Sequence, residues 1–411
     1  MEIESLSFES KHLSPSDQIK QGSFYTPKKI VDKVHQLTDC YKNQNNTVIF
    51  DNSAGAGAFI KAEKNIIYKV AEVDITALQL LKDKLPQKQV FSGNSLSQVT
   101  RSKYNISPID FLIQVGNPPY NDTTSAYKNG QKGTNICDKD LFDRDLGISF
   151  LKSYSKLEAD IVCVLHPLSY LIKKANFKRL KGFAQNYILK KGVLFSSSMF
   201  KNVSSTAFPI VIALYKKSLK GMNYPKIQNF KFSIMDSKAH FVLNKYKITD
   251  SFIRKYPPKK TDDSISDIGL YYYTFRDINS LKRNRAFHTK RVNNSIVVSM
   301  KELYKYAYLF AFKKLFQPID SWIYGNLSPL GQLNEVKKNS KLFIKYLFIT
   351  EKQALDQLNN QRKNKILKYY CLKRSDLKHI SEIKEKTDLL IHSLSGLNKK
   401  EVYFQNTFDF I

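Results

Sequence analysis

The stretch "IDFLIQVGNPPY", residues 109–120, decides the fold, because an apolar run ends abruptly in a rigid polar motif. Proline fixes φ and has no backbone N–H, and the residue before a proline is driven out of the α region. We therefore expect a buried strand over 109–116 and an extended segment beyond its end. That segment presents two acceptors, the side-chain oxygen of Asn117 and the carbonyl of Pro118, beside the flat ring of Tyr120. Such a site suits a planar ligand that carries an amino group.

Strands and helices alternate on both sides of this stretch. Helices are expected at "TPKKIVDKVHQL", with Thr26 as N-cap and Pro27 in the first position, and at "GAFIKAEK", "TALQLLKDKL" and "GISFLKSYSKL". Apolar strands are expected at "TVIFD", "IIYKVAEVD", "ADIVCVLHP" and "FPIVIALYKK". This alternation predicts an α/β fold with a mostly parallel, doubly wound sheet. Ligands of such sheets lie beyond the carboxyl ends of the strands, where Asp51, Glu72 and Asn117 fall.

A glycine-containing turn follows the strand that ends in Asp51. Its glycines, Gly55 and Gly57, allow a ligand to approach the backbone closely, although a dinucleotide loop would contain a third glycine. Glu72 ends the next strand, roughly 20 positions further on, where an acidic residue can bind a ribose diol. Taken alone, the two glycines are equally well explained as a tight turn, and Glu72 as an ordinary surface carboxylate.

The order of these segments resembles that of the amino-directed DNA methyltransferases of restriction–modification systems, the adenine-N6 group in particular. The chain runs from "GSFYTPKKIVDKV" through "FDNSAGAGAF" and "AEVD" to "GNPPY", which is similar to the gamma-type order of that family. The resemblance covers residues 20–216. It implies the S-adenosylmethionine-dependent methyltransferase fold, S-adenosyl-L-methionine as cofactor and a DNA target-recognition domain after the catalytic domain.

The resemblance also implies roles for individual residues. Those implied in cofactor binding are Tyr25, Thr26, Pro27, Asp51, Gly55, Gly57, Glu72 and Asn94. Asn94 stands where the family usually has an acidic residue against the cofactor's adenine, and its side-chain oxygen can still accept a hydrogen bond. The implied catalytic residues are Asn117, Pro118, Pro119 and Tyr120. Phe200 is expected to pack against the flipped base, with Phe195 as second choice and a core position as the alternative for both.

The chemistry of an adenine amine explains why this motif would suit it. The amine is a weak nucleophile because its lone pair is delocalised into the ring. Two acceptors around it favour a pyramidal nitrogen whose lone pair faces the methyl group, so positioning and electrostatics supply most of the catalysis. The base must first leave the duplex, and Tyr120 would then stack on it. No histidine base is needed, so His166 is expected to be structural.

The polar segment 121–145 is expected to close on DNA as a mobile loop. Its charge run, "DKDLFDRD", is expected to be a solvated face. The chain contains no convincing nuclease constellation, which leaves a separate cognate restriction endonuclease open as a partner.

Charge indicates a nucleic-acid partner. The 411 residues include 66 Lys+Arg and 36 Asp+Glu, a net charge of +30, which favours nucleic acid or an anionic membrane surface. Residues 225–411 hold 35 of the cations and 17 of the acids. The DNA contacts expected there, in a segment that begins with three tyrosines, are Lys282, Arg283, Arg285, Lys290 and Arg291.

These features predict three parts: an arm over 1–20, a methyltransferase domain over 21–220 and a mixed, basic DNA-recognition domain over 225–411. The four cysteines form no C-x-x-C pair, so neither a disulfide framework nor a metal site is expected. No run approaches the ~18 apolar residues of a membrane span, and the N-terminus lacks an apolar signal region. A cytoplasmic protein without a membrane partner is therefore expected.

The sequence thus predicts a site-specific adenine-N6 methyltransferase that acts on double-stranded DNA, as the modification part of a restriction–modification system. An RNA adenine methyltransferase, a DNA cytosine-N4 methyltransferase and a non-catalytic DNA-specificity subunit stay open as alternatives. Protein-glutamine methyltransferases also carry NPPY, but they do not need a large basic C-terminal domain.

Overall fold

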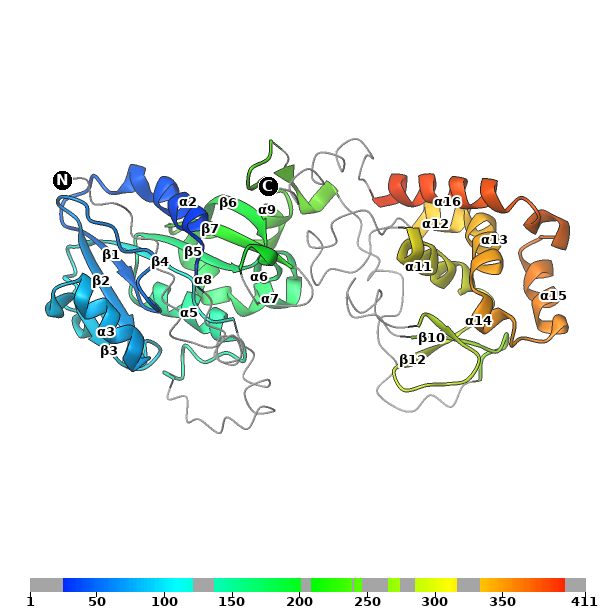
Figure 1. The fold of residues 1–411 in the computed structure, drawn as a ribbon, viewed down its shortest axis with the longest axis horizontal. Coiled ribbons are helices and arrows are strands. Elements are labelled where there is room, and N and C mark those ends of the chain that lie inside the picture. Colours follow the sequence, from blue (N-terminus) through cyan, green and yellow to red (C-terminus); the bar gives the residue numbers. More distant parts are fainter. Residues whose placement is uncertain are drawn as a thin grey trace. The chain divides into compact units, whose positions relative to one another are not determined.

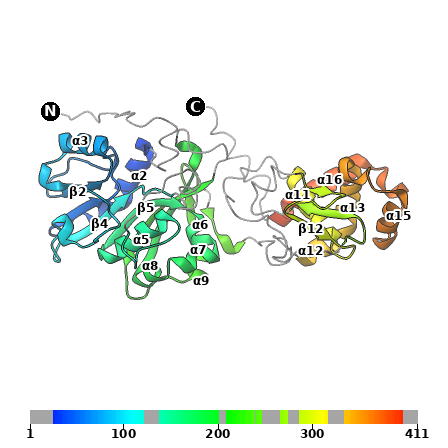
Figure 2. The same cartoon turned by 90° about the horizontal axis from the view of Figure 1, so that it is seen from below.

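The computed structural model describes residues 25–120, 137–200, 208–238, 240–245, 265–273, 285–315 and 333–395. The chain divides into two compact units, Met1–Leu243 and Asn244–Ile411 (Figure 1 and Figure 2). None of the described helices has the length and apolar character of a membrane span.

The first unit is built on a nine-stranded sheet with the order β3-β2-β1-β4-β5-β7-β6-β8-β9. Its parallel strands are β1 (Thr47–Asp51), β2 (Ile67–Glu72), β3 (Val90–Ser92), β4 (Phe111–Gly116) and β5 (Ile161–Pro167). β7 (Pro209–Lys217) is antiparallel to both of its neighbours, β5 and β6 (Tyr187–Ser196). This arrangement confirms the predicted α/β sheet of the S-adenosylmethionine-dependent methyltransferase fold.

Two short strands extend the sheet beyond residue 220, where the sequence predicted the end of the methyltransferase domain. β8 (Phe232–Ile234) pairs in parallel with β6, and β9 (His240–Phe241) pairs antiparallel with β8. Phe232 is fully buried, and a Cβ on Gly192 of β6 would lie only 2.6 Å from its ring. The missing side chain at Gly192 therefore makes room for β8, and the first unit continues to Leu243.

Helices cover both faces of this sheet (Figure 1). They are α2 (Lys28–Thr38), α3 (Ile75–Lys84), α5 (Leu146–Lys156), α6 (Ser169–Ile172), α7 (Lys174–Arg179), α8 (Lys181–Asn186) and α9 (Tyr224–Gln228). Ile30, Val31 and Val34 of α2 join a core cluster with alternate residues of the central strands, among them Ile113 and Val115 of β4. The helix expected at "GAFIKAEK" does not form; the chain there makes turns instead.

The second unit combines a small antiparallel sheet with helices, which agrees with the mixed structure expected there. Its strands, in the order β11-β10-β12, are β10 (Leu270–Tyr273), β11 (Phe287–His288) and β12 (Ser295–Val298). Its helices are α11 (Leu303–Leu315), α12 (Leu333–Lys338), α13 (Ser340–Thr350), α14 (Lys352–Leu355), α15 (Asn360–Tyr369) and α16 (Ile380–Ser395). Tyr272 is fully buried between the rings of Phe287 and Tyr306, so it belongs to the core.

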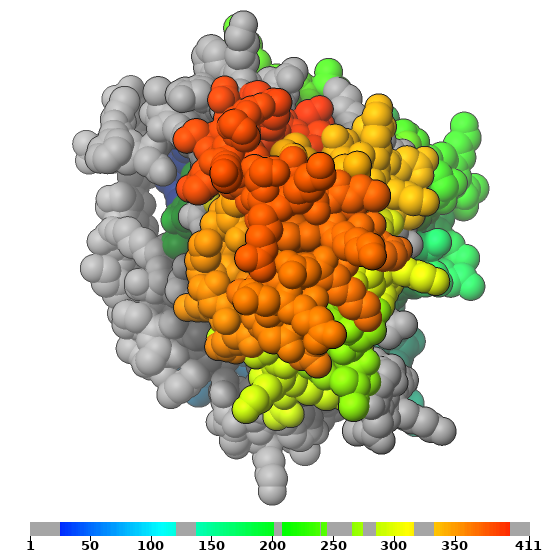
Figure 3. All heavy atoms as spheres, turned by 90° about the vertical axis from the view of Figure 1, so that its right-hand side faces the viewer, coloured from blue at the N-terminus to red at the C-terminus, as the bar shows by residue number. Residues whose placement is uncertain are grey.

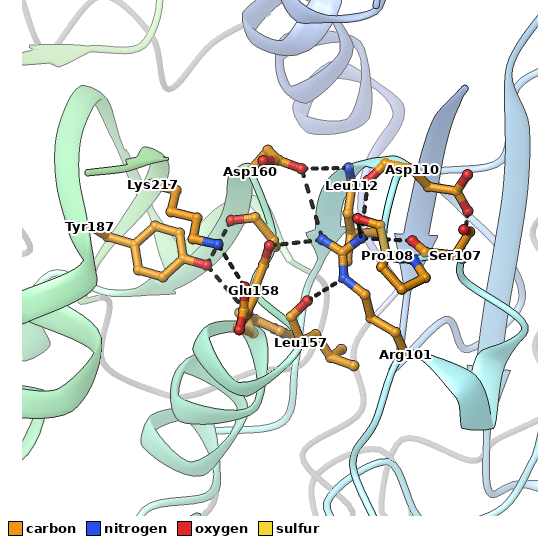
Figure 4. A network of polar contacts seen from close by, with 12 residues as sticks. Arg101, Ser107, Pro108, Asp110, Leu112, Leu157, Glu158, Asp160, Tyr187 and Lys217 are labelled. Atoms are coloured by element: carbon orange, nitrogen blue, oxygen red, sulfur yellow. Dashed lines mark hydrogen bonds and ion pairs between the residues drawn. The ribbon is translucent and has the colours of Figure 1, made fainter. Parts of the chain in front are cut away.

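Arg101 organises the edge of the first sheet where β4 and β5 begin (Figure 4). Its guanidinium donates to the backbone carbonyls of Leu157 and Glu158, each at 2.9 Å, and of Ser107 and Asp110, at 2.9 and 3.0 Å. A hollow at this edge is lined by side chains of both charges, among them Arg101 itself. Since these contacts tie loops together at the amino ends of the strands, Arg101 has a structural role.

Candidate active site

Three neighbouring strand ends bring the predicted cofactor and catalytic residues to one edge of the sheet. Asp51 ends β1, Glu72 ends β2, and Asn117 directly follows β4. Because β1 lies between β2 and β4 and pairs in parallel with both, the three side chains occupy adjacent positions. The placement that the sequence predicted for them is therefore found, while their roles stay predictions.

Asp51 is a buried carboxylate, with only 4% of its surface exposed. Burial raises its pKa to about 7; the charge of Glu72 contributes to this rise, and the hydrogen bond from the Ser53 N–H, at 3.0 Å, opposes it. A Cβ on Gly116 would lie 2.9 Å from the Asp51 Oδ1 atom. Glycine at the end of β4 thus leaves room for this carboxylate beside the start of the NPPY motif.

Glu72 connects the glycine turn to the end of β2. Its carboxylate accepts hydrogen bonds from the backbone N–H groups of Gly55 and Val73, both at 2.7 Å, and of Asp74, at 3.1 Å. The side chains of Val73 and Ile75, on either side of Asp74, are 68% and 84% exposed. A carboxylate held by N–H groups and flanked by exposed apolar side chains fits a ligand with a hydroxylated and an apolar part.

The two glycines of the turn serve different purposes. Gly57 has a φ of +79°, and a Cβ there would lie 2.5 Å from the Ile60 side chain and 2.8 Å from that of Leu81, so close packing on α3 requires glycine. Gly55 has a φ of +50° and open space where a Cβ would be. That open backbone leaves room for a ligand, and the predicted contact with S-adenosylmethionine stays a prediction.

The NPPY motif contacts the Tyr-Thr-Pro segment directly. The Asn117 Nδ2 atom donates to the Thr26 hydroxyl at 3.2 Å, although 91 positions separate the two residues. The hydroxyl of Tyr120 donates to the Asn117 Oδ1 atom. The Asn117 amide plane is thus held between two hydroxyl groups, a contact that the sequence alone did not reveal.

The prediction of Thr26 as N-cap is wrong. Helix α2 begins at Lys28, and the carbonyl of Pro27 accepts the N–H groups of Ile30 and Val31 at 2.9 and 3.1 Å. No side chain caps this helix. The Thr26 hydroxyl faces Asn117 instead, because Pro27 occupies the cap position itself.

Asn94 follows β3 and lies in a tight turn. Its Oδ1 atom accepts the backbone N–H of Leu96 at 2.9 Å, and its carbonyl accepts from the Lys103 ammonium at 2.8 Å. The oxygen that was expected to contact the cofactor's adenine therefore also supports the turn.

Phe195 and Phe200 are both core residues in this structure. They are 2% and 4% exposed, their ring centroids are 5.9 Å apart, and the partly buried Tyr120 packs against the same cluster. Their burial agrees with the alternative that the sequence left open, and a base-stacking role for Phe200 stays a prediction.

Gln114 is a buried polar residue of β4 that the sequence did not single out. It is fully buried in β4, and its Nε2 atom donates to the Asn52 Oδ1 atom at 3.3 Å. Asn52 in turn donates to the Ser153 hydroxyl of α5 at 3.4 Å. The sequence feature that points to Gln114 is a single glutamine inside an apolar strand, since buried polar groups need hydrogen-bond partners.

The charge run 138–145 is a solvated face only in part: Lys139, Asp140 and Arg144 are exposed, whereas the three other aspartates make specific contacts. Asp143 is 9% exposed and forms an ion pair with Arg179, which helps to keep the pKa of that carboxyl below its usual range. Asp145 caps α5 by accepting the Gly147 N–H at 3.1 Å. Asp138 accepts two backbone N–H groups of the loop that follows β3, at 2.8 and 3.1 Å. These carboxylates fix the chain that leads into α5, whereas residues 121–136 of the predicted loop lie outside the described residues.

His166 is structural, as expected. It is buried, its Nε2 atom lies 2.7 Å from the Tyr215 hydroxyl, and its ring stacks on Tyr170 at 5.4 Å. Burial lowers its pKa to about 4, so the imidazole is neutral at physiological pH. The described residues also contain no group of three or more His, Cys, Asp or Glu side chains arranged to hold a metal ion.

The predicted DNA contacts are only partly described. Lys282 and Arg283 lie outside the described residues. Arg285, Lys290 and Arg291 lie around β11 in the second unit. Their contact with DNA stays a prediction.

Comparison with known families identifies the segment that carries the site. Residues 11–202 match the model of the family described as N-6 DNA Methylase. This segment belongs to the N-6 DNA methylase family. The methylase segment includes every predicted cofactor, catalytic and base-stacking residue and strands β1 to β6 of the first unit.

Several solved structures are similar to parts of the chain. A modification subunit assigned to a type I restriction enzyme of Vibrio vulnificus has 15% identity and a TM-score of 0.38, with 54% of this chain and 50% of that chain covered. The type I restriction-modification methyltransferase subunit of Streptococcus thermophilus has 15% identity and a TM-score of 0.35, with 47% and 45% covered. A protein of Listeria monocytogenes assigned to the class I S-adenosylmethionine-dependent methyltransferases has 15% identity and a TM-score of 0.37, with 52% and 66% covered.

The chain therefore spans about half the length of the two type I subunits. No curated protein matches it.

Proposed function

We propose that this protein is a site-specific DNA methyltransferase that transfers a methyl group from S-adenosylmethionine to the N6 amine of a flipped adenine in duplex DNA. We place it as the modification part of a restriction–modification system, with a separate endonuclease as its partner. The observation that carries the proposal is the Asn117 amide, held by Thr26 and Tyr120 at the edge where Asp51 and Glu72 also lie.

The residues around the glycine turn fit the cofactor. Glu72 would bind the ribose hydroxyls, the open backbone at Gly55 would border the methionine part, and Val73 with Ile75 would cover the adenine. Asp51, beside the catalytic motif, would face the ammonium group. S-adenosylmethionine supplies an activated methyl group when it is bound.

The chain's own residues would position the target amine. The Asn117 Oδ1 atom and the Pro118 carbonyl would accept its two hydrogens, which favours a pyramidal nitrogen with an available lone pair. In the present structure the Tyr120 hydroxyl donates to the same Oδ1 atom, so the incoming amine would replace it. Tyr120 would then be free to place its ring against the base, where stacking is worth about 1–3 kcal/mol.

The hydrogen bond from the Asn117 amide to the Thr26 hydroxyl would limit the motion of the amide during this exchange. The bond to Thr26 joins the catalytic motif to the segment that would close over the cofactor. Such preorganised polar contacts are effective because they need no rearrangement in the transition state.

The experiment that tests the proposal combines the protein with labelled S-adenosylmethionine and, in separate reactions, duplex DNA or RNA, and identifies the modified nucleoside. N6-methyladenine, absent with Asn117→Ala, is the expected result. N4-methylcytosine, or label found in RNA alone, would overturn the assigned substrate. Cofactor binding without transfer to any nucleic acid would indicate a non-catalytic subunit instead.

A further inference from the structure

Positive charge in the second unit gathers on and around α15. Residues 352–378 include eight cations and two acids; the cations are Lys352, Arg362, Lys363, Lys365, Lys368, Lys373, Arg374 and Lys378. By contrast, residues 380–395, which form α16, include two lysines and three acids. Within the described part of the chain, only Lys363 of these cations forms an ion pair, with Asp356 at 3.9 Å. Figure 3 shows the face that contains these residues, in orange.

Helix α15 presents most of its surface to solvent. Its buried residues are Ile366 and Leu367, which attach one side of the helix to the unit. Since 3.6 residues make a turn and residues four apart share a face, the opposite side is formed by Gln361, Asn364, Lys365 and Lys368. All four of these side chains are exposed.

The first turn of α15 is held in a defined position. The Asn359 side chain caps it by accepting the Arg362 N–H at 2.9 Å. The Arg374 guanidinium donates to the side-chain oxygens of Asn360 and Asn364, at 3.3 and 3.1 Å. Two amide side chains of the exposed helix are therefore oriented before any partner binds.

Two contacts connect α15 to the small sheet of the same unit. The Thr289 hydroxyl lies 2.5 Å from the Gln357 Oε1 atom, which places the chain after β11 beside the residues that precede α15. Arg362 covers Gly269, where a Cβ would lie only 2.5 Å from its Nη1 atom. Because Lys290 and Arg291 follow Thr289 directly, their part of the chain and α15 belong to one cationic region.

The residue types on the outer side of α15 match the major groove of B-DNA. Asparagine and glutamine pair with adenine edges, and lysine contacts phosphates. The major groove, about 12 Å wide, admits an α-helix, whereas the deep, narrow major groove of A-form RNA does not admit side chains.

We propose that α15 is a recognition helix that enters the DNA major groove, with Gln361 and Asn364 contacting base edges and Lys365 and Lys368 contacting phosphates. This inference rests on the proposed function, and it assigns the reading of the target sequence to residues 360–368 of the second unit.

Salt-dependent DNA binding tests the phosphate contacts. Each contact contributes about 0.9 to the slope of log affinity against log salt, so Lys365→Ala/Lys368→Ala should lower the slope by about 2. The control Lys337→Ala/Lys338→Ala removes the same charge from exposed positions of α12 and should leave the slope unchanged. Equal slopes for the α15 variant and the wild type would overturn the inference, as would equally tight binding of duplex RNA.

Mapping of the methylated sites tests the base contacts. Gln361→Ala/Asn364→Ala should relax the sequence requirement at one or two positions, with about 5- to 150-fold less discrimination, while melting temperature and cofactor affinity stay near wild type. An unchanged recognition sequence at full affinity would place sequence reading elsewhere. A wild-type protein that methylates no DNA would refute the proposed function, while the salt slopes would still decide whether α15 contacts DNA.

Discussion

Replacing Asp51 with asparagine should stabilise the protein above neutral pH while weakening cofactor binding. The folded state holds the Asp51 pKa at about 7, whereas an unfolded aspartate has a pKa of about 3.9. The folded state therefore keeps a proton that the unfolded state has already lost, so the contribution of this group to stability falls as pH rises from about 4 to 7. It then stays at its lowest value at higher pH.

The size of the effect follows from that difference. About 3 pKa units at 1.36 kcal/mol each give an upper bound of about 4 kcal/mol in the free energy of unfolding at pH 8. Asparagine has a similar shape, carries no charge and can still accept the Ser53 N–H. At about 2–4 °C per kcal/mol for a domain of this size, Asp51→Asn should raise the melting temperature by several degrees at pH 8 and by much less at pH 5.

The assay measures melting temperature at both pH values and cofactor affinity at pH 8 by calorimetry. Asp83→Asn, at an exposed position of α3, is the matched control and should change neither quantity. Cofactor affinity should fall for Asp51→Asn if the Asp51 carboxylate faces the ammonium group. A lower melting temperature at pH 8, or an equal shift at both pH values, would refute the reasoning about the buried carboxylate.

Four further substitutions at three positions examine the rest of the site. Glu72→Ala should weaken S-adenosylmethionine binding by about 1.5–3 kcal/mol, because it removes a charged hydrogen-bond acceptor. If calorimetry shows that this variant binds S-adenosylmethionine with wild-type affinity, Glu72 is excluded from the site. Asn117→Ala should slow methyl transfer about a hundredfold to a thousandfold. Its melting temperature and cofactor affinity should stay near wild type. Near-normal rates of methyl transfer would show that the NPPY motif is only a turn. Tyr120→Phe should keep activity, since it retains the ring and frees the Asn117 oxygen. Tyr120→Ala should weaken capture of the flipped base by about 1–3 kcal/mol, because stacking is lost. Equal activity of both variants in single-turnover assays would argue against stacking.

The sequence by itself determined the alternating architecture and the positions of the site residues along the chain. Strand and helix periods are local properties, and so are the backbone restrictions of glycine and proline. For that reason Asp51, Glu72 and Asn117 could be placed at strand ends without coordinates. Parallel strands then bring their carboxyl ends to one edge, which made the common location of these residues predictable.

Only the tertiary structure decided which distant residues meet. Thr26 looked like a helix cap because its neighbours in sequence suggested one, yet its hydroxyl contacts Asn117. Asp143 and Asp138 belong to a charge run that the sequence places in solvent, yet they contact Arg179 and the loop after β3. In helix α15, burial of Ile366 and Leu367 decides which of its sides faces solvent. Such contacts depend on how separate elements pack in space, and local sequence patterns carry no information on that packing.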